Sequence, residues 1–196
     1  MRYSSDHKAE TRARILREAA KEIRAKGPDN VGVAGVMKRA GLTHGGFYSH
    51  FASKDALVTE AIGAMFDDAG AVSRAIEAAN EPRAALVGYI DFYLSRAHRD
   101  ARERGCPLPA LSSDLARSTP AARDRFAAGV SALTRRLARA LAALGVVKPE
   151  SEASAMLSQL VGAGVLARAV EGAASDAILA DAKASLLARY GLETAA

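Results

Sequence analysis

The stretch VMKRAGLTHGGFYSHFASKDAL, residues 36–57, decides the fold of the amino-terminal part of the chain. Apolar residues at helical spacing predict a short helix at about 33–40, and Gly41 ends it because glycine adopts the left-handed conformation at little cost. Thr43 is placed to cap a second short helix over about 44–50. Two short helices joined by so tight a turn are typical of a helix-turn-helix, whose second helix reads DNA.

Along the rest of the chain, apolar residues at helical spacing predict only helices. A longer basic helix precedes the pair at about 9–26, and Ser53 caps a helix that runs to the late seventies with Asp55 in its positive first turn. Further helices are expected at about 82–103, 112–117, 120–144, 150–172 and 175–190, separated by Gly and Pro. We therefore predict an all-α protein, with a three-helix domain at residues 1–54 and a helical bundle at residues 55–196.

Positive charge is concentrated in the first of these two parts. The chain has 27 Lys and Arg against 22 Asp and Glu. Residues 1–54 contain 11 of the basic and 5 of the acidic residues, a net charge of +6, whereas the remainder has a net charge of −1. Only the amino-terminal part carries the charge expected of a polyanion binder. The alternative of a helical adaptor that does not bind DNA leaves this charge without a role.

Several other classes of protein are not supported. No apolar stretch approaches the ~20 residues that span a bilayer, and the polar amino terminus is unlike a signal peptide, so we expect a cytoplasmic protein without a membrane partner. A P-loop, a GxGxxG motif, an HExxH motif and a nucleophile elbow are all absent from the sequence. The four histidines are not at metal-ligand spacing. We expect no catalytic residue, no metal and no cofactor.

The amphipathic pattern divides the amino-terminal residues into two sets. One set is expected to form the core against Ile15, Ala19 and Ile23, and consists of Val33, Val36, Met37, Leu42, Phe47, Phe51 and Leu57. The other set lies on the side that is free to meet DNA, and consists of Thr43, His44, Gly45, Tyr48, His50 and Lys54.

Residues 36–57 closely resemble the amino-terminal signature of the TetR family of transcriptional regulators. The shared elements are the Gly-apolar-Thr turn at 41–43, a Gly before an aromatic-Tyr pair at 46–48, the His-Phe pair at 50–51 and the Ser-Lys-acid-x-Leu sequence at 53–57. The resemblance covers residues 10–62. It implies a repressor that binds a near-palindromic double-stranded DNA operator as a homodimer, and that an effector in the carboxy-terminal domain releases.

Three of the DNA-facing residues are expected to bind phosphate. Thr43 presents its hydroxyl and nearby backbone N–H groups at an electropositive helix terminus, unless its role is capping alone. Tyr48 offers a phenolic donor and Lys54 a mobile ammonium, which position the protein without reading sequence. The alternative for a single lysine is a solvated surface charge.

Base reading is expected to depend on few side chains. His44, at the start of the second helix, is the best candidate for contact with a base edge, and His50 is expected to address the DNA backbone. Family members often carry a larger polar residue where this chain has Gly45. That departure leaves fewer side chains that can contact bases, so we expect DNA shape to assist recognition. Gly45 and Gly46 also weaken the helix by about 1 kcal/mol each relative to Ala.

The carboxy-terminal part is expected to sense a small molecule. Apolar residues available to line a cavity are Phe66, Ile90, Phe92, Tyr93, Leu94, Leu111, Phe126, Val130 and Leu133, although most are expected to be plain core. Cys106 is the single cysteine, and nearby Arg102 and Arg104 are expected to favour its thiolate. Some TetR-like repressors sense oxidants or electrophiles through cysteine, so the effector is a small molecule or an electrophile; a buried, inert thiol is the alternative.

The last two helices are expected to pair two subunits. Their apolar residues are too numerous for an exposed face, and include Met156, Leu157, Leu160, Val161, Gly162, Gly164, Val165, Leu166 and Val170. TetR-like proteins dimerise through a four-helix bundle of this kind. An intramolecular core is the alternative for part of the same set.

Overall fold

The computed structural model describes residues 2–77 and 80–193, which form helices without a strand, as the all-α prediction requires. The helices are α1 (Arg2–Lys26), α2 (Val33–Arg39), the 3-10 helix η1 (His44–Ser49), α3 (Lys54–Glu77), α4 (Pro82–Tyr93), α5 (Arg96–Asp100), α6 (Pro107–Leu115), α7 (Pro120–Ala143), α8 (Pro149–Ala169) and α9 (Gly172–Arg189). None of the described helices has the length and hydropathy needed to cross a membrane.

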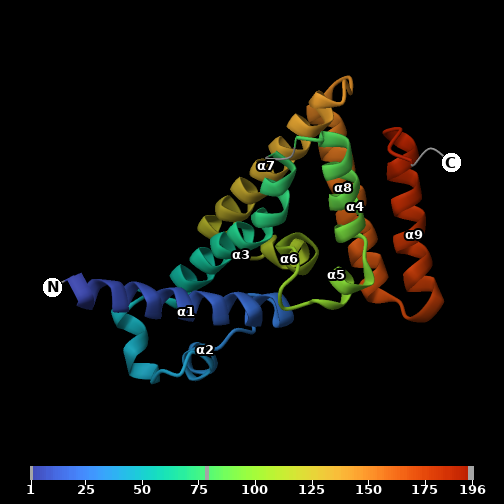
Figure 1. Ribbon diagram of the computed structural model, residues 1–196. Coiled ribbons are helices and arrows are strands. Elements are labelled where there is room, and N and C mark those ends of the chain that lie inside the picture. Colours follow the sequence, from blue (N-terminus) through green and yellow to red (C-terminus); the bar gives the residue numbers. More distant parts are fainter. Residues whose placement is uncertain (1, 78–79, 194–196) are drawn as a thin grey trace.

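The helices form a small base and a larger bundle above it (Figure 1). Helix α1 lies across the base, with α2 and η1 beneath it. Helices α3 and α7 rise obliquely from the base and pack along each other, while α4, α8 and α9 form the other side of the bundle. The short helix α6 lies in the middle, where it contacts α1, α3, α7 and α8.

The core of the base is the one predicted from periodicity. Val36, Met37, Phe47, Phe51 and Leu57 are buried in one cluster with the apolar face of α1, and Val33 and Leu42 pack partly against it. The cluster also takes in residues from beyond position 54, namely Val58, Ala61, Ile62 and Met65 of α3, Leu111 and Leu115 of α6 and Ala122 of α7. The base is therefore built on elements that continue into the bundle.

Two predicted helices in the bundle have different bounds in the structure. The helix expected at 82–103 is interrupted, because α4 ends at Tyr93 and the Ser95 hydroxyl caps α5 by accepting a hydrogen bond from the His98 N–H at 3.1 Å. The helix expected at 112–117 is α6, which begins earlier, at Pro107. Proline is tolerated in the first helical turn because its missing N–H has no intrahelical partner there.

The amino-terminal helices also differ in detail from the prediction. Helix α1 begins at Arg2 rather than near residue 9. The second short helix is a 3-10 helix, η1, rather than an α-helix. Gly45 and Gly46 form a third of its six residues, and their low helix propensity accounts for the irregular form. Ser53 caps α3 as predicted, since its hydroxyl accepts a hydrogen bond from the Ala56 N–H at 3.0 Å.

Candidate functional site

The turn between α2 and η1 has the geometry that the sequence predicts. Gly41 adopts a φ of +70°, a conformation that a residue with a Cβ rarely takes. The Leu42 N–H donates to the Met37 carbonyl at 2.9 Å and closes the turn. Thr43 takes the extended N-cap conformation, but its hydroxyl makes no capping hydrogen bond, so the expected capping by its side chain is wrong. Thr43 is instead exposed.

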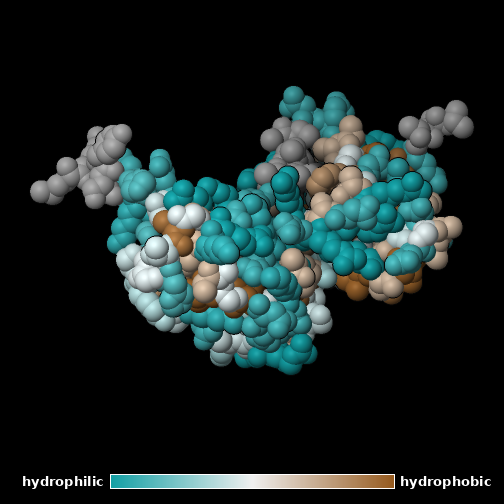
Figure 2. Space-filling view, turned by 90° about the horizontal axis from the view of Figure 1, so that it is seen from below, coloured by the Kyte–Doolittle hydropathy of each residue, from teal (hydrophilic) through white to brown (hydrophobic). Residues whose placement is uncertain are grey.

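Four of the six DNA-facing residues point to solvent from this turn and from η1. Thr43, His44 and Gly45 are exposed, and Tyr48 is 70 % exposed. The ring of buried Phe47 anchors Tyr48 by an edge-to-face contact at 5.2 Å between ring centroids. A Cβ at Gly45 would meet nothing within 4 Å, so packing does not require glycine there. The surface of the base seen from below is largely hydrophilic (Figure 2).

The other two residues, His50 and Lys54, are half-buried and have contacts within the protein. The His50 Nδ1 is buried without a hydrogen-bond partner, and burial, then the charges of Lys8 and Arg12, lower the pKa of its imidazole. The Lys54 ammonium donates to the Asp29 carbonyl at 2.8 Å and so ties the start of α3 to the loop before α2. Lys54 therefore has a structural contact in addition to its predicted contact with phosphate.

Arg12 of α1 sets the orientation of η1. Its guanidinium lies over the Phe51 ring at 4.6 Å from the centroid and donates to the His50 carbonyl at 3.4 Å. The same group forms an ion pair with Glu60 of α3. The end of η1 is thus held against both neighbouring helices. Lys38, which the sequence analysis did not single out, is exposed in the last turn of α2 and adds positive charge next to the turn.

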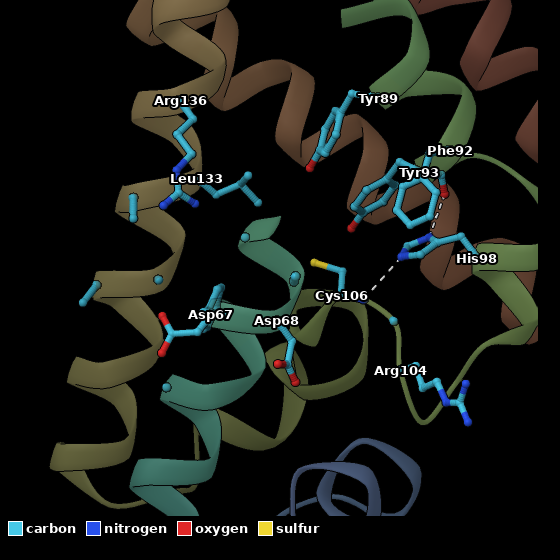
Figure 3. Close-up of a pocket in the computed structure, with 18 of the residues that line it drawn as sticks. Asp67, Asp68, Tyr89, Phe92, Tyr93, His98, Arg104, Cys106, Leu133 and Arg136 are labelled. Carbon is cyan, nitrogen blue, oxygen red and sulfur yellow. Dashed lines mark hydrogen bonds between the residues drawn. The ribbon is translucent and has the colours of Figure 1, made fainter. Parts of the chain in front are cut away.

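The bundle contains a cavity of about 220 Å³ between α3, α4, α5, α7 and the loop before α6 (Figure 3). Phe66, Phe92, Tyr93 and Cys106, which the sequence analysis proposed as effector-binding residues, all line it. Of the other apolar candidates, Leu133 lines the cavity, Ile90, Leu94 and Leu111 are buried in the two cores, and Phe126 and Val130 pack against them. Tyr89, His98 and Arg136 also line the cavity.

Cys106 is a protonated thiol in this environment. It is 6 % exposed, and burial raises the pKa of its thiol more than Tyr93, the Leu108 backbone, Arg168 and Arg24 lower it. The prediction that Arg102 and Arg104 favour a thiolate is therefore wrong. Both arginines are exposed, and the cations that act on Cys106 come from α8 and α1 instead.

His98 was not recognised from the sequence, yet it holds Cys106 in the cavity wall. It is 7 % exposed; its Nδ1 lies 2.8 Å from the Tyr93 carbonyl, and its Nε2 accepts a hydrogen bond from the Cys106 N–H at 3.3 Å. These two contacts require the neutral imidazole with its proton on Nδ1. The pKa of His98 is lowered, chiefly by burial, in agreement with the neutral form of the imidazole. The sequence places His98 within a helix that the structure interrupts.

Two features connect the cavity to the base. Cys106 is the residue immediately before α6, whose Leu111 and Leu115 lie in the core of the base. Arg24, near the end of α1, is 7 % exposed and donates to the carbonyls of Glu103 at 3.3 Å and Met65 at 3.4 Å. One guanidinium thus joins α1, α3 and the loop that leads to Cys106.

The residues proposed for the subunit interface divide into two groups. Met156 and Leu160 are 0 % exposed, and Gly164 is buried beside the Tyr93 ring, so these three belong to the core of the protomer. They face inward because α8 lies against α4 and α7. Val161 is half-buried, whereas Val165 is 42 % exposed. Leu166 and Val170 are also exposed and continue this apolar surface at the end of α8.

Family models match both parts of the chain. The model described as bacterial regulatory proteins of the tetR family matches residues 15–61, and the model described as the Tetracyclin repressor-like C-terminal domain matches residues 82–187. The chain belongs to the TetR family. Its members are DNA-binding transcriptional regulators, so the helix-turn-helix at the base of the structure is the DNA-binding element of this TetR-family chain.

Solved structures of TetR-family proteins share the whole fold. A regulator from Chloroflexus aurantiacus is 20% identical, with a TM-score of 0.82 over 95% of this chain and 96% of its own. The reduced form of Escherichia coli NemR is 19% identical, with a TM-score of 0.80 over 90% and 95%. A regulator from Agrobacterium tumefaciens is 21% identical, with a TM-score of 0.78 over 93% and 98%. No curated protein matches the chain significantly.

Proposed function

We propose that this TetR-family protein is a repressor that binds a near-palindromic operator as a homodimer and releases it when a small-molecule effector occupies the cavity. The observation that carries the proposal is the position of Cys106, which lines the cavity and immediately precedes α6. Because Leu111 and Leu115 of α6 are buried in the core of the base, a displacement at the cavity wall would be passed to the DNA-binding element.

The DNA-binding half of the proposal relies on the exposed residues of η1 and of the turn before it. His44 reads a base edge, while Thr43 and Tyr48 bind phosphate. Two such elements about 34 Å apart match successive major grooves, which is why a dimer is proposed. The exposed apolar residues Val165, Leu166 and Val170 support an interface formed by the carboxy-terminal helices.

Selection of bound sequences from a random DNA pool tests this half. His44→Ala should change the selected sequence, whereas Tyr48→Phe should weaken binding similarly on all sequences. Affinity should fall steeply with added salt, because phosphate contacts release counterions. An unchanged selection with His44→Ala would remove its reading role. Failure of the protein to retain DNA at low salt would overturn the proposal as a whole.

Filling the cavity tests the effector half without knowledge of the effector. Ala132 lines the cavity on α7, so Ala132→Trp should imitate occupancy and lower operator affinity. Ala143→Trp is the matched control, because Ala143 is exposed at the end of the same helix. Circular dichroism establishes that both variants fold. Equal operator affinity of the two variants would contradict release through the cavity.

An electrophile is the second form of effector that we propose, because the single cysteine lies in the cavity wall. Iodoacetamide forms a carbon–sulfur bond at the thiol and expels iodide, while the thiol proton passes to solvent. Alkylation should release the operator from wild type and not from Cys106→Ser. Because burial keeps Cys106 protonated, its reaction should be slower than that of a free thiol such as glutathione. Equal release from both proteins would exclude sensing by Cys106.

A further inference from the structure

The inner end of the cavity brings together three protonated groups. They are the hydroxyls of Tyr89 and Tyr93, both on α4, and the thiol of Cys106. The three residues are buried, with exposed fractions of 5 %, 3 % and 6 %. Figure 3 shows both hydroxyls and the sulfur directed toward the same space between α4 and the helices opposite. This end of the cavity therefore presents hydrogen-bond donors.

The Tyr93 hydroxyl makes no hydrogen bond of normal geometry among the described residues, and the neighbouring Cys106 sulfur is a weak acceptor. The hydroxyl lies near enough to Cys106 to stabilise a thiolate there, but the thiol is the form present. A buried hydroxyl without a strong acceptor is unfavourable in the empty protein. An acceptor atom of a ligand that reached Tyr93 would satisfy it.

The surroundings of these donors disfavour a negatively charged acceptor. Burial is the largest cause that raises the pKa of Tyr89, Tyr93 and Cys106, and the nearby charges of Arg136 and Arg168 do not reverse it. A carboxylate placed among them would meet the same desolvation penalty. Asp67, Asp68, Arg104 and Arg125 line the cavity too but are exposed. Arg136 also lines it and is half-buried, but its charge lowers the pKa of Tyr89 less than burial raises it.

The size and walls of the cavity restrict the ligand further. Its volume of about 220 Å³ lies below the ~300–1,000 Å³ of sites for drug-sized molecules, so the ligand is close to a single ring in size. The rings of Phe66, Phe92 and Tyr93 are among its walls. The Phe66 ring packs directly on Gly129 of α7, where a Cβ would lie 2.4 Å from the ring. A flat ring packs well against aromatic walls of this kind.

We infer that the cavity binds a small, neutral, flat compound whose carbonyl oxygen accepts hydrogen bonds from the hydroxyls of Tyr93 and Tyr89. Tyr93 is the residue that selects for the carbonyl, because its hydroxyl otherwise has only the weakly accepting Cys106 sulfur beside it. The inference rests on the proposed role of the cavity as the effector site, and it adds the chemical class of the effector.

Three probes of similar size test the inference on the free protein. They are acetophenone, which has a carbonyl; ethylbenzene, which lacks an acceptor; and benzoate, which is charged. Affinities are measured by ligand-observed NMR titration. Acetophenone should bind wild type about tenfold more tightly than ethylbenzene, and benzoate should bind more weakly than acetophenone. Tyr93→Phe should abolish the preference for acetophenone. Tyr190→Phe, which removes a tyrosine hydroxyl that bonds Glu152 outside the cavity, should leave it intact.

Four results would overturn the inference: no binding of acetophenone, equal binding of ethylbenzene, tighter binding of benzoate, or an unchanged preference in a folded Tyr93→Phe protein. The ranking of the probes on wild type tests the inference even if that variant fails to fold. Because the titration contains no DNA, a failure of acetophenone to bind would not contradict operator binding or the effect of Ala132→Trp. Conversely, acetophenone binding without any effect of Ala132→Trp would contradict the proposed function alone.

Discussion

Replacing Arg24 with methionine should loosen the junction between the base and the cavity. The guanidinium donates to the Glu103 and Met65 carbonyls at 3.3 and 3.4 Å, near the long end of the hydrogen-bond range, so each bond is worth about 0.5–1.5 kcal/mol. Its contact with Asp68 at 3.8 Å adds little, because Asp68 is 61% exposed. Methionine keeps the apolar stem buried but leaves both carbonyls without this donor. The expected loss is about 1–2 kcal/mol.

Thermal unfolding followed by circular dichroism measures this loss. For a chain of this length, 1 kcal/mol corresponds to about 2–4 °C, so Arg24→Met should lower the Tm by about 2–8 °C. Arg17→Met is the matched control, since Arg17 lies exposed on the same helix. A surface change of this kind should stay within about 0.5 kcal/mol. Equal Tm values for the two variants would refute the reasoning that Arg24 holds the junction.

Two further predictions concern stability. Burial lowers the pKa of His98 below its ordinary value of 6.5, so the unfolded chain takes up a proton before the folded protein does as the pH falls. Wild type should therefore lose more stability than His98→Gln between pH 7.5 and 5.5. Parallel losses of stability in the two proteins would contradict the role of the neutral imidazole. Gly88→Ala, in open space on α4, should stabilise by about 1 kcal/mol through helix propensity. Gly129→Ala should be less stable than Gly88→Ala by about 1–3 kcal/mol, because the new Cβ at position 129 would collide with the Phe66 ring. Chemical denaturation measures the difference. Equal gains in the free energy of unfolding would show that the Phe66 ring moves freely.

The amino-terminal part was predictable because its signals are local. Gly41 with φ of +70° and the Ser53 cap depend on residues a few positions away, and both have the predicted geometry. The buried cluster around Phe47 follows from helical periodicity, which states which face of each helix is apolar. The family assignment followed from the same stretch of sequence.

The tertiary structure determined the burial, pKa and hydrogen bonding that depend on residues distant in sequence. Periodicity marks an apolar face but not what covers it, and so Met156 and Leu160 lie in the protomer core, while Val165 remains exposed. The pKa of Cys106 follows from desolvation by several helices rather than from the arginines next to it in sequence. His98 and Arg24 acquire their roles only when a helix break and the fold bring distant carbonyls and amides to them. Thus the sequence by itself determined the helix-turn-helix and the family, and the packing of the bundle determined the cavity, because burial and hydrogen bonding are properties of neighbours in space.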